Sequence, residues 1–190
     1  MADEPARRQP GGGDFEREAL VHLNAVLRFA RALTGGDADA EDLAQETYLQ
    51  AWRHWNQYQA GTNCRAWLFT ICRNLRFKTA RRAEREIVTE DAEMENLAAA
   101  AVHAVLAETD PAGKFLEAPE LEDIVRREVA RLPEEYREAV VLSDLEDQSY
   151  DSIAAVLGVP IGTVKSRLFR GRRLLQQSLI EYARDAGLVV

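Results

Sequence analysis

An acidic segment over residues 84–120 interrupts the chain and argues against one continuous helical domain. It carries 2 Lys/Arg and 10 Asp/Glu, a net charge of −8, which equals the formal net charge of the whole protein. Pro111, Gly113 and Pro119 disfavour a long helix there, because proline lacks a backbone donor and glycine is conformationally permissive. We therefore predict an acidic linker, partly helical around 91–107, between two folded modules.

The region before the linker has helical periodicity throughout. Apolar residues recur every three or four positions over 15–33, 37–58 and 64–84, which predicts three amphipathic helices. Gly35-Gly36 is expected to end the first helix and Asp37 to cap the second, whereas Thr62 or Asn63 can cap the third. The second helix is expected to bury one face: Ala40, Leu43, Ala44, Thr47, Ala51 and Trp55.

The region after the linker has the same period and no strand-like alternation. A helix over 121–131 ends before Pro133, and the next helix carries Ala139, Val140, Leu142 and Leu145. We predict an all-α fold of two small helical domains joined by the acidic linker, the C-terminal one a helix-turn-helix. The expected boundaries are a disordered tail over 1–14, a helical domain over 15–84, the linker over 85–120 and the helix-turn-helix domain over 121–190.

The pattern from Ser149 to Leu168 predicts a helix-turn-helix. Ser149 can cap a short helix, Gly158 can supply a turn residue with positive φ, and a longer helix follows from Ile161 to about Ala183. Five cations follow the turn, within 165–173, and such side chains contact bases and phosphates. A plain helical hairpin with a solvated basic face is the alternative; the position of the cations after the turn favours DNA binding.

The first module combines aromatic and basic residues. Trp52, Trp55 and Trp67 lie within sixteen residues, and Arg65 to Arg82 contains six cations and no acid. Cations that follow phosphates and rings that receive unstacked bases suit single-stranded DNA. The alternative is that each ring fills the core of a helical bundle. The second helix also carries an acidic and polar face over 39–50, which is either solvated or docks on a protein.

Other functional classes find little support in the sequence. No apolar run approaches the roughly 18–20 residues that span a bilayer, and no apolar stretch of a signal peptide precedes Gly13. Cys64 and Cys72 lie eight residues apart, too far for an easy disulfide, and no histidine has metal-ligand spacing to them. We predict a cytoplasmic protein without membrane insertion, catalytic residues, metal or cofactor; a redox switch at the cysteines is the rival.

These motifs together resemble one family. The segments 37–52 and 62–74 resemble the promoter-melting domain of extracytoplasmic-function (ECF) sigma factors, and 132–142 with 150–173 resembles their C-terminal DNA-binding domain. The resemblance implies a sigma factor that binds core RNA polymerase and promoter DNA, recognises −35 and −10 elements and aids melting. By family analogy it also implies an anti-sigma factor as partner.

The resemblance assigns three sets of residues. The −35 set would read duplex DNA: Thr163, Lys165, Ser166, Arg167, Arg170 and Arg173. The −10 set would hold the melted strand and a flipped base: Gln59, Thr62, Asn63, Arg65, Arg73, Asn74, Arg76 and Lys78. The polymerase set would dock on the largest subunit: Asp39, Asp42, Gln45 and Glu46. The alternative is an ordinary helix-turn-helix regulator that binds duplex DNA as a dimer, which leaves the aromatic and basic module unexplained.

Overall fold

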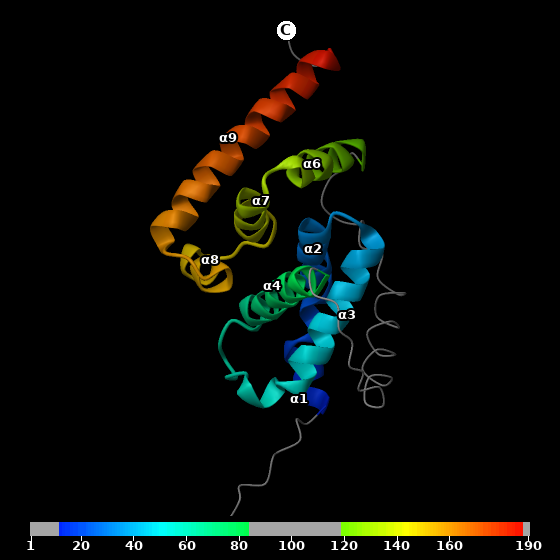
Figure 1. Ribbon diagram of the computed structural model, residues 1–190, viewed down its shortest axis with the longest axis vertical. Coiled ribbons are helices and arrows are strands. Elements are labelled where there is room, and N and C mark those ends of the chain that lie inside the picture. The colour runs from blue at the N-terminus through cyan, green and yellow to red at the C-terminus, as the bar shows by residue number, and fades with distance from the viewer. Residues whose placement is uncertain (1–11, 84–118, 188–190) are drawn as a thin grey trace, which may run out of the picture.

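A computed structural model describes residues 12–83 and 119–187, and within these ranges every regular element is helical (Figure 1). The N-terminal domain consists of α1 (Gly12–Glu18), η1 (Leu20–His22), α2 (Leu23–Thr34), α3 (Asp37–Arg53), η2 (Trp55–Gln57) and α4 (Cys64–Ala83). The C-terminal domain consists of α6 (Pro119–Arg131), α7 (Glu134–Val140), η3 (Val141–Leu145), α8 (Tyr150–Leu157) and α9 (Ile161–Asp185). The predicted all-α fold class is confirmed. Most of the expected tail and linker, residues 1–11 and 84–118, lies outside the described ranges, and α1 begins inside the expected tail.

The single helix predicted over 15–33 is wrong. The Ala19 carbonyl accepts hydrogen bonds from the His22 amide at 3.0 Å and from the Tyr48 hydroxyl at 3.1 Å, and a short 3₁₀ turn follows. This break lets Phe15 turn its ring toward the end of α3 and η2, where Trp52 and Trp55 meet it edge-on with ring centroids 5.0 Å away. Aromatic packing therefore outweighs helical continuity at this position.

The junction between α2 and α3 agrees with the sequence in part. Gly35 adopts φ +78° and ends α2, as predicted, because the left-handed conformation costs glycine no Cβ clash. Asp37 does not cap α3; Gly36 occupies that position, and the Asp37 carboxylate instead pairs with Arg31 at 2.8 Å. The six residues predicted for the inner face are all buried, although α3 ends at Arg53 and Trp55 follows in η2.

Helix α4 begins where predicted and is capped by Asn63, whose side-chain oxygen accepts the Ala66 amide at 3.0 Å. Leu68 is fully buried, while Trp67, Ile71 and Leu75 are half-buried. Phe69 and Cys72 are also fully buried, which confirms the interpretation that Phe69 fills the core and that the thiol packs as a small apolar side chain. Phe69 packs on Phe29 of α2 with ring centroids 5.0 Å apart, which ties α4 to α2.

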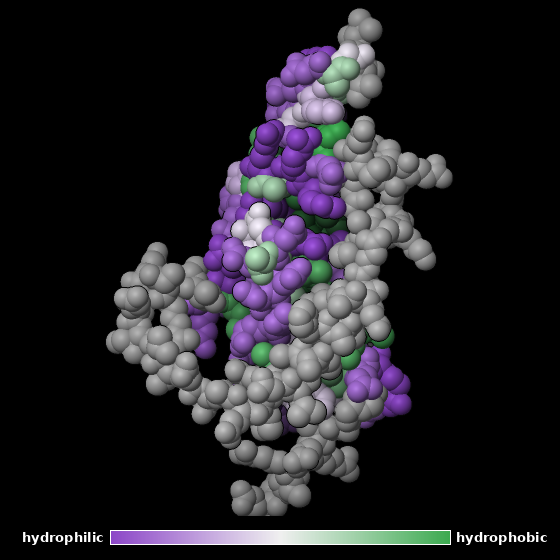
Figure 2. Space-filling model, turned by 90° about the vertical axis from the view of Figure 1, so that its right-hand side faces the viewer, coloured by the Kyte–Doolittle hydropathy of each residue, from purple (hydrophilic) through white to green (hydrophobic). Residues whose placement is uncertain are grey.

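The C-terminal domain is built around α7 and the long helix α9, which runs to the C-terminal end in Figure 1. Ser149 accepts the Ser152 amide at 3.2 Å and Gly158 adopts φ +64°, so the predicted roles of both residues are confirmed. Leu145 is 48% exposed rather than buried, because α7 widens into a π-helical turn at η3. Figure 2 shows a face on which hydrophilic residues predominate among the described ones.

A membrane span finds no support from any single described helix, since none is both long and apolar enough to cross a bilayer. Helices α8 and α9 together are long and apolar enough, but they are bent by 99° relative to each other.

Gly171 sets the approach of α9 to α7 and supplies a stability prediction. A Cβ at this position would lie 2.8 Å from Cγ2 of the buried Val140. Gly171→Ala should therefore destabilise the fold by about 1–3 kcal/mol through overpacking, despite the better helix propensity of alanine. We expect the melting temperature to fall by roughly 3–10 °C in circular dichroism. Gly162→Ala, in the same helix with open space around it, is the control and should not lower the melting temperature.

Candidate nucleic-acid interface

The turn between α8 and α9 fixes the first turns of α9 on the surface. Ile153, Leu157, Val164 and Leu168 are buried between the two helices. This wedge turns the opposite face of α9 outward, and Lys165, Ser166, Arg170 and Arg173 of the −35 set are exposed while Thr163 and Arg167 are half-buried. The whole −35 set thus lies on one helix, beside a sharp turn.

Two of these cations already have partners within the domain. Arg167 lies 3.6 Å from the Glu135 carboxylate, and Arg170 donates a long hydrogen bond of 3.5 Å to the Tyr136 hydroxyl. Lys165 and Arg173 form no ion pair with any other residue in 12–83 or 119–187. The charges of Lys165 and Arg173 are therefore available to a polyanion. The guanidinium groups of Arg167 and Arg170, in contrast, contact Glu135 and Tyr136 of α7.

A second surface is centred on the loop between η2 and α4. The Tyr58 hydroxyl donates to the Thr62 carbonyl at 3.0 Å, and the Thr62 hydroxyl donates to the Gln59 carbonyl at 2.7 Å. The ring of Tyr58 stacks on Trp55 with centroids 4.7 Å apart. The aromatic residues thus lie mostly in or against the core, and they hold the loop in shape from beneath.

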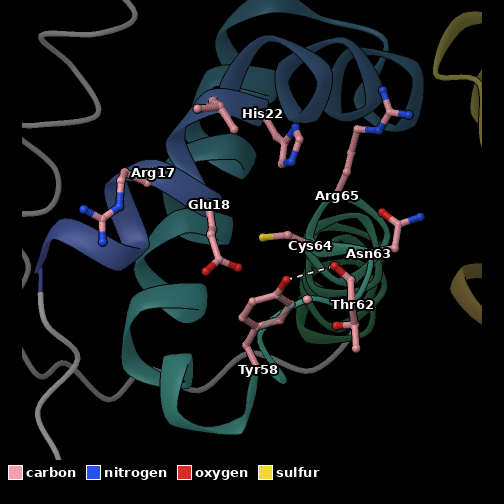
Figure 3. A pocket seen from close by; sticks show the side chains of 10 residues that line it. Arg17, Glu18, His22, Tyr58, Thr62, Asn63, Cys64 and Arg65 are labelled. Atoms are coloured by element: carbon pink, nitrogen blue, oxygen red, sulfur yellow. Dashed lines mark hydrogen bonds between the residues drawn. The ribbon is translucent and has the colours of Figure 1, made fainter.

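A pocket of about 410 Å³ lies between this loop and the N-terminal helices (Figure 3). Its wall includes Thr62, Asn63 and Arg65 of the −10 set, together with Glu18 and His22 from α1 and η1. The sequence did not predict Glu18 and His22, since no motif links them to a loop that lies far along the chain. Only the break after α1 brings that segment against the loop.

The pocket combines neutral groups with one acid, Glu18, and two arginines, Arg17 and Arg65. Burial, with the charge of Arg65 as a smaller cause, lowers the pKa of His22, so the imidazole is neutral at pH 7. Burial raises the pKa of Cys64 to about 11, so its thiol is protonated. The pocket therefore offers hydrogen-bonding groups of both kinds, with the Glu18 side chain directed toward its interior (Figure 3).

The remainder of the −10 set lies along α4 and divides into two groups. Asn74 and Lys78 are exposed and Arg65 is half-buried. Arg76 donates to the Leu33 carbonyl at 3.2 Å and so satisfies the end of α2, while Arg73 pairs with Glu138 of α7 at 3.0 Å. The structure therefore gathers the predicted residues on one helix and its preceding loop, but gives Arg73 and Arg76 on the helix, like Thr62 and Asn63 in the loop, partners within the protein.

The polymerase set occupies the first half of α3, away from its buried face. Asp39 and Asp42 are exposed, and Gln45 and Glu46 are half-buried. Glu46 accepts a hydrogen bond from Gln50 at 2.9 Å, one turn further along. The four side chains thus share an acidic and polar surface on one helix.

The cysteines and metal-ligating residues do not form a site in the part of the chain that the structure describes. Cys64 and Cys72 are free and buried, and no group of three or more His, Cys, Asp or Glu is placed to hold a metal ion in 12–83 and 119–187. Both thiols pack as small apolar side chains.

Comparison with known proteins places this geometry in one family. The sigma-70 region 2 model matches residues 20–86 and the sigma-70 region 4 model matches 122–175. ECF RNA polymerase sigma factor EcfG of Rhodopseudomonas palustris is 35% identical over 90% of this chain and 88% of its own length. ECF RNA polymerase sigma factor SigE of Mycolicibacterium smegmatis is 36% identical over 87% of this chain, which spans 62% of that protein.

A solved structure shares the fold. The sigma factor RpoE of Bartonella quintana, crystallised with the anti-sigma factor NepR, superposes with a TM-score of 0.66 and 31% identity. The match covers 87% of this chain and 96% of that one. Both halves of the fold therefore have counterparts in known proteins.

The thiol environments predict low reactivity. Burial raises the pKa of Cys72 to about 12 and that of Cys64 to about 11, so little nucleophilic thiolate exists at pH 8. We expect the native chain to react with Ellman's reagent at least tenfold more slowly than the same chain in guanidinium chloride, which should titrate both thiols. Rapid labelling of the native protein would instead support a reactive or redox-active cysteine.

Proposed function

The chain belongs to the extracytoplasmic-function sigma factors, and from this membership we propose that it directs core RNA polymerase to promoters with a −35 and a −10 element. The observation that carries the proposal is the presence of both sigma-70 regions, in order, in one chain. A duplex-binding dimeric regulator would need only the helix-turn-helix and would leave the whole region 2 match without a role.

For the −35 element, we assign the exposed start of α9 to the major groove. An α-helix fits that groove, and Lys, Arg, Ser and Thr side chains can bond base edges or phosphates there. Lys165 and Arg173 supply charge that has no ion-pair partner among the described residues, while Arg167 and Arg170 lie against α7, which limits their freedom before binding. The assignment of the six residues of the −35 set rests on this placement.

For the −10 element, we assign the loop 59–63 and the pocket beneath it to the melted strand. A flipped base needs a cavity with hydrogen-bonding groups, and the pocket offers Glu18 and neutral His22, while the Asn63 side chain in its wall is bonded to Ala66, Gln148 and Ser152. Asn74 and Lys78 would follow the backbone along α4. In this proposal the protein supplies binding energy for strand opening and performs no catalysis of its own, so no cofactor is required.

For the polymerase, we assign the acidic face of α3. Asp39 and Asp42 are exposed, so a basic surface on the largest subunit would steer and hold them. We further propose an anti-sigma factor as a partner and a cytoplasmic location. The first follows from the Bartonella quintana relative, which was solved with such a protein, and the second from the location of the transcription machinery.

The decisive test of the proposal is transcription in vitro. Purified core RNA polymerase should produce specific transcripts from a pool of promoter fragments only when this protein is added. The transcripts should share two upstream elements. A folded protein that neither binds core polymerase nor produces transcripts, but binds a palindromic duplex as a dimer, would show instead that the regulator alternative is correct.

Separate variants should distinguish the two DNA-binding surfaces. Lys165→Ala with Arg173→Ala should weaken binding of a −35 duplex by roughly 5–100-fold, and the slope of its salt dependence should fall by about 0.9 for each phosphate that the variant no longer neutralises. Binding of a −10 single strand should not change, as measured by fluorescence anisotropy. Asn74→Ala with Lys78→Ala should have the opposite pattern, and Arg184→Ala, which removes an exposed charge at the end of α9, should affect neither.

The acidic face of α3 predicts a selective defect in polymerase binding. Asp39→Ala with Asp42→Ala should lower affinity for core polymerase by roughly tenfold, because the variant removes two charges from a partly desolvated interface. Glu16→Ala with Asp185→Ala removes the same charge from exposed positions elsewhere and should bind normally in the same pull-down or interferometry assay. An equal decrease for both double variants would mean that net charge, rather than this face, controls binding.

A further inference from the structure

The side chains of the loop that borders the pocket are already engaged within the protein. The Tyr58 hydroxyl donates to the Thr62 carbonyl at 3.0 Å, and the Thr62 hydroxyl is itself bonded within the loop. The Asn63 amide donates to Gln148 at 3.0 Å, and its side-chain oxygen accepts the Ala66 amide at 3.0 Å. These bonds shape the loop, but they leave its polar side chains few groups with which to distinguish one ligand from another.

The polar groups that stay open to a ligand come from the N-terminal helices. Glu18, the last residue of α1, directs its carboxylate toward the interior of the pocket, and the His22 imidazole lines the same pocket (Figure 3). Glu18 forms no ion pair with any residue in 12–83 or 119–187. The Tyr58 hydroxyl lies beside it, but its one proton is already donated to Thr62. The carboxylate therefore keeps lone pairs for a donor that enters from outside.

Packing of α1 fixes the position of Glu18. Phe15 lies one helical turn earlier on the same side of α1, because residues three apart are neighbours on a helix surface. The Phe15 ring is buried and meets two tryptophan rings with centroids 5.0 Å away. The hydrogen bond from the Tyr48 hydroxyl of α3 to the Ala19 carbonyl then holds the end of the helix. The carboxylate therefore lies on a segment that is anchored to α3.

The charge of Glu18 acts across the pocket on groups that keep their protons. Burial raises the pKa of Cys64 to about 11, and the charge of Glu18 is the next cause. Burial is also the largest cause of the raised pKa of Tyr58, and Glu18 adds to it. Among the described residues that line the pocket, Glu18 is the acid, and Arg65 is a half-buried cation in the wall. A ligand in the interior thus meets a charged acceptor, while a phosphate at the wall meets Arg65.

The DNA bases differ in what they offer to a carboxylate. Adenine, cytosine and guanine carry an exocyclic amino group that donates hydrogen bonds, whereas thymine carries a carbonyl oxygen in the corresponding place. A carboxylate accepts and does not donate, so it bonds an amino group and repels a carbonyl oxygen. The neutral imidazole of His22 has one donor and one acceptor nitrogen, which suits the ring nitrogens and carbonyl groups beside that amino group. The open groups of the pocket therefore favour a base with an amino group.

From these observations we propose that Glu18 is a specificity-determining residue of the −10 site, which accepts a hydrogen bond from the exocyclic amino group of the base in the pocket. The site binds adenine, cytosine or guanine and rejects thymine and uracil. This preference comes from α1 and not from the polar side chains of the loop, which are bonded to the protein itself. The inference rests on the proposed function, because it uses the assignment of the pocket to a flipped base.

The test uses the full chain and a −10 single strand taken from a promoter that this protein transcribes with core polymerase. Cytosine and uracil are compared at each position of the strand by fluorescence anisotropy. At one position cytosine should bind roughly 5–100-fold more tightly than uracil. Glu18→Gln should bring that ratio close to unity at that position alone, because an amide donates as well as accepts. Glu16→Gln, the same charge change at an exposed position of α1, is the matched control and should keep the ratio.

Changes in the strand keep the result interpretable if the Glu18 variant folds poorly in circular dichroism. At the same position, 2-pyrimidinone lacks only the amino group of cytosine and should bind the wild-type protein more weakly than cytosine by a similar factor. Uracil lacks the methyl group of thymine and should be rejected as strongly as thymine.

Three results would overturn the role of Glu18 while the proposed function stands. They are equal binding of cytosine, 2-pyrimidinone and uracil at every position, a ratio that a folded Glu18→Gln variant leaves unchanged, and rejection of thymine with full binding of uracil, which would mean that the methyl group is excluded by its size. Absence of protein-dependent transcripts with core polymerase would overturn the proposed function itself.

Discussion

The relation between the two domains depends on pairing buried acids of the second with arginines of the first. Glu138 and Glu146 lie on α7 and just after η3, where apolar residues would otherwise be expected, and each meets a guanidinium from the N-terminal domain. An unpaired carboxylate at such a position would be costly, so the pairs specify how α2 and α4 lie against α7. A purely apolar interface would permit several arrangements, whereas two directional pairs admit few.

The same constraint explains why several polar residues of the first domain have a double role. Because the formal net charge of the chain is −8, the positive charge that binds DNA must be concentrated on small parts of the surface. Arg76 satisfies the carbonyl end of α2, and Asn63 caps α4 while also reaching α8. Such residues connect the shape of the N-terminal domain to its proposed ligand, because removing one disturbs a helix end as well as a DNA-binding group. Asn74 and Lys78 are exposed on α4, so their substitution tests ligand binding more directly.

The helix positions and most buried faces could be predicted because they follow from local rules. Gly35, Gly158, Ser149 and Asn63 behave as their chemistry requires, whatever surrounds them. The failures arise where distant segments compete with local preference. The Tyr48 hydroxyl donates a hydrogen bond to the Ala19 carbonyl, and the helix that periodicity alone would continue is broken there. The Asp37 carboxylate pairs with Arg31 and therefore does not cap α3. The walls of the pocket depend on that break, so Glu18 and His22 had no recognisable signal in the sequence.

The cations of the two domains differ in their partners: some pair with an acid of the same domain, one pairs with an acid of the other domain, and some form no ion pair among the described residues. In the second domain, Arg172 is held by Asp144, while Lys165 and Arg173 on the same helix form no ion pair within the described residues. In the first domain, Arg73 is held by an acid that belongs to the other domain. A cation satisfied within its own domain stays satisfied when the domains move, but one satisfied across the interface is released by that movement. Separation of the domains would therefore free the guanidinium of Arg73 on α4, whereas Arg172 on α9 would keep its partner Asp144.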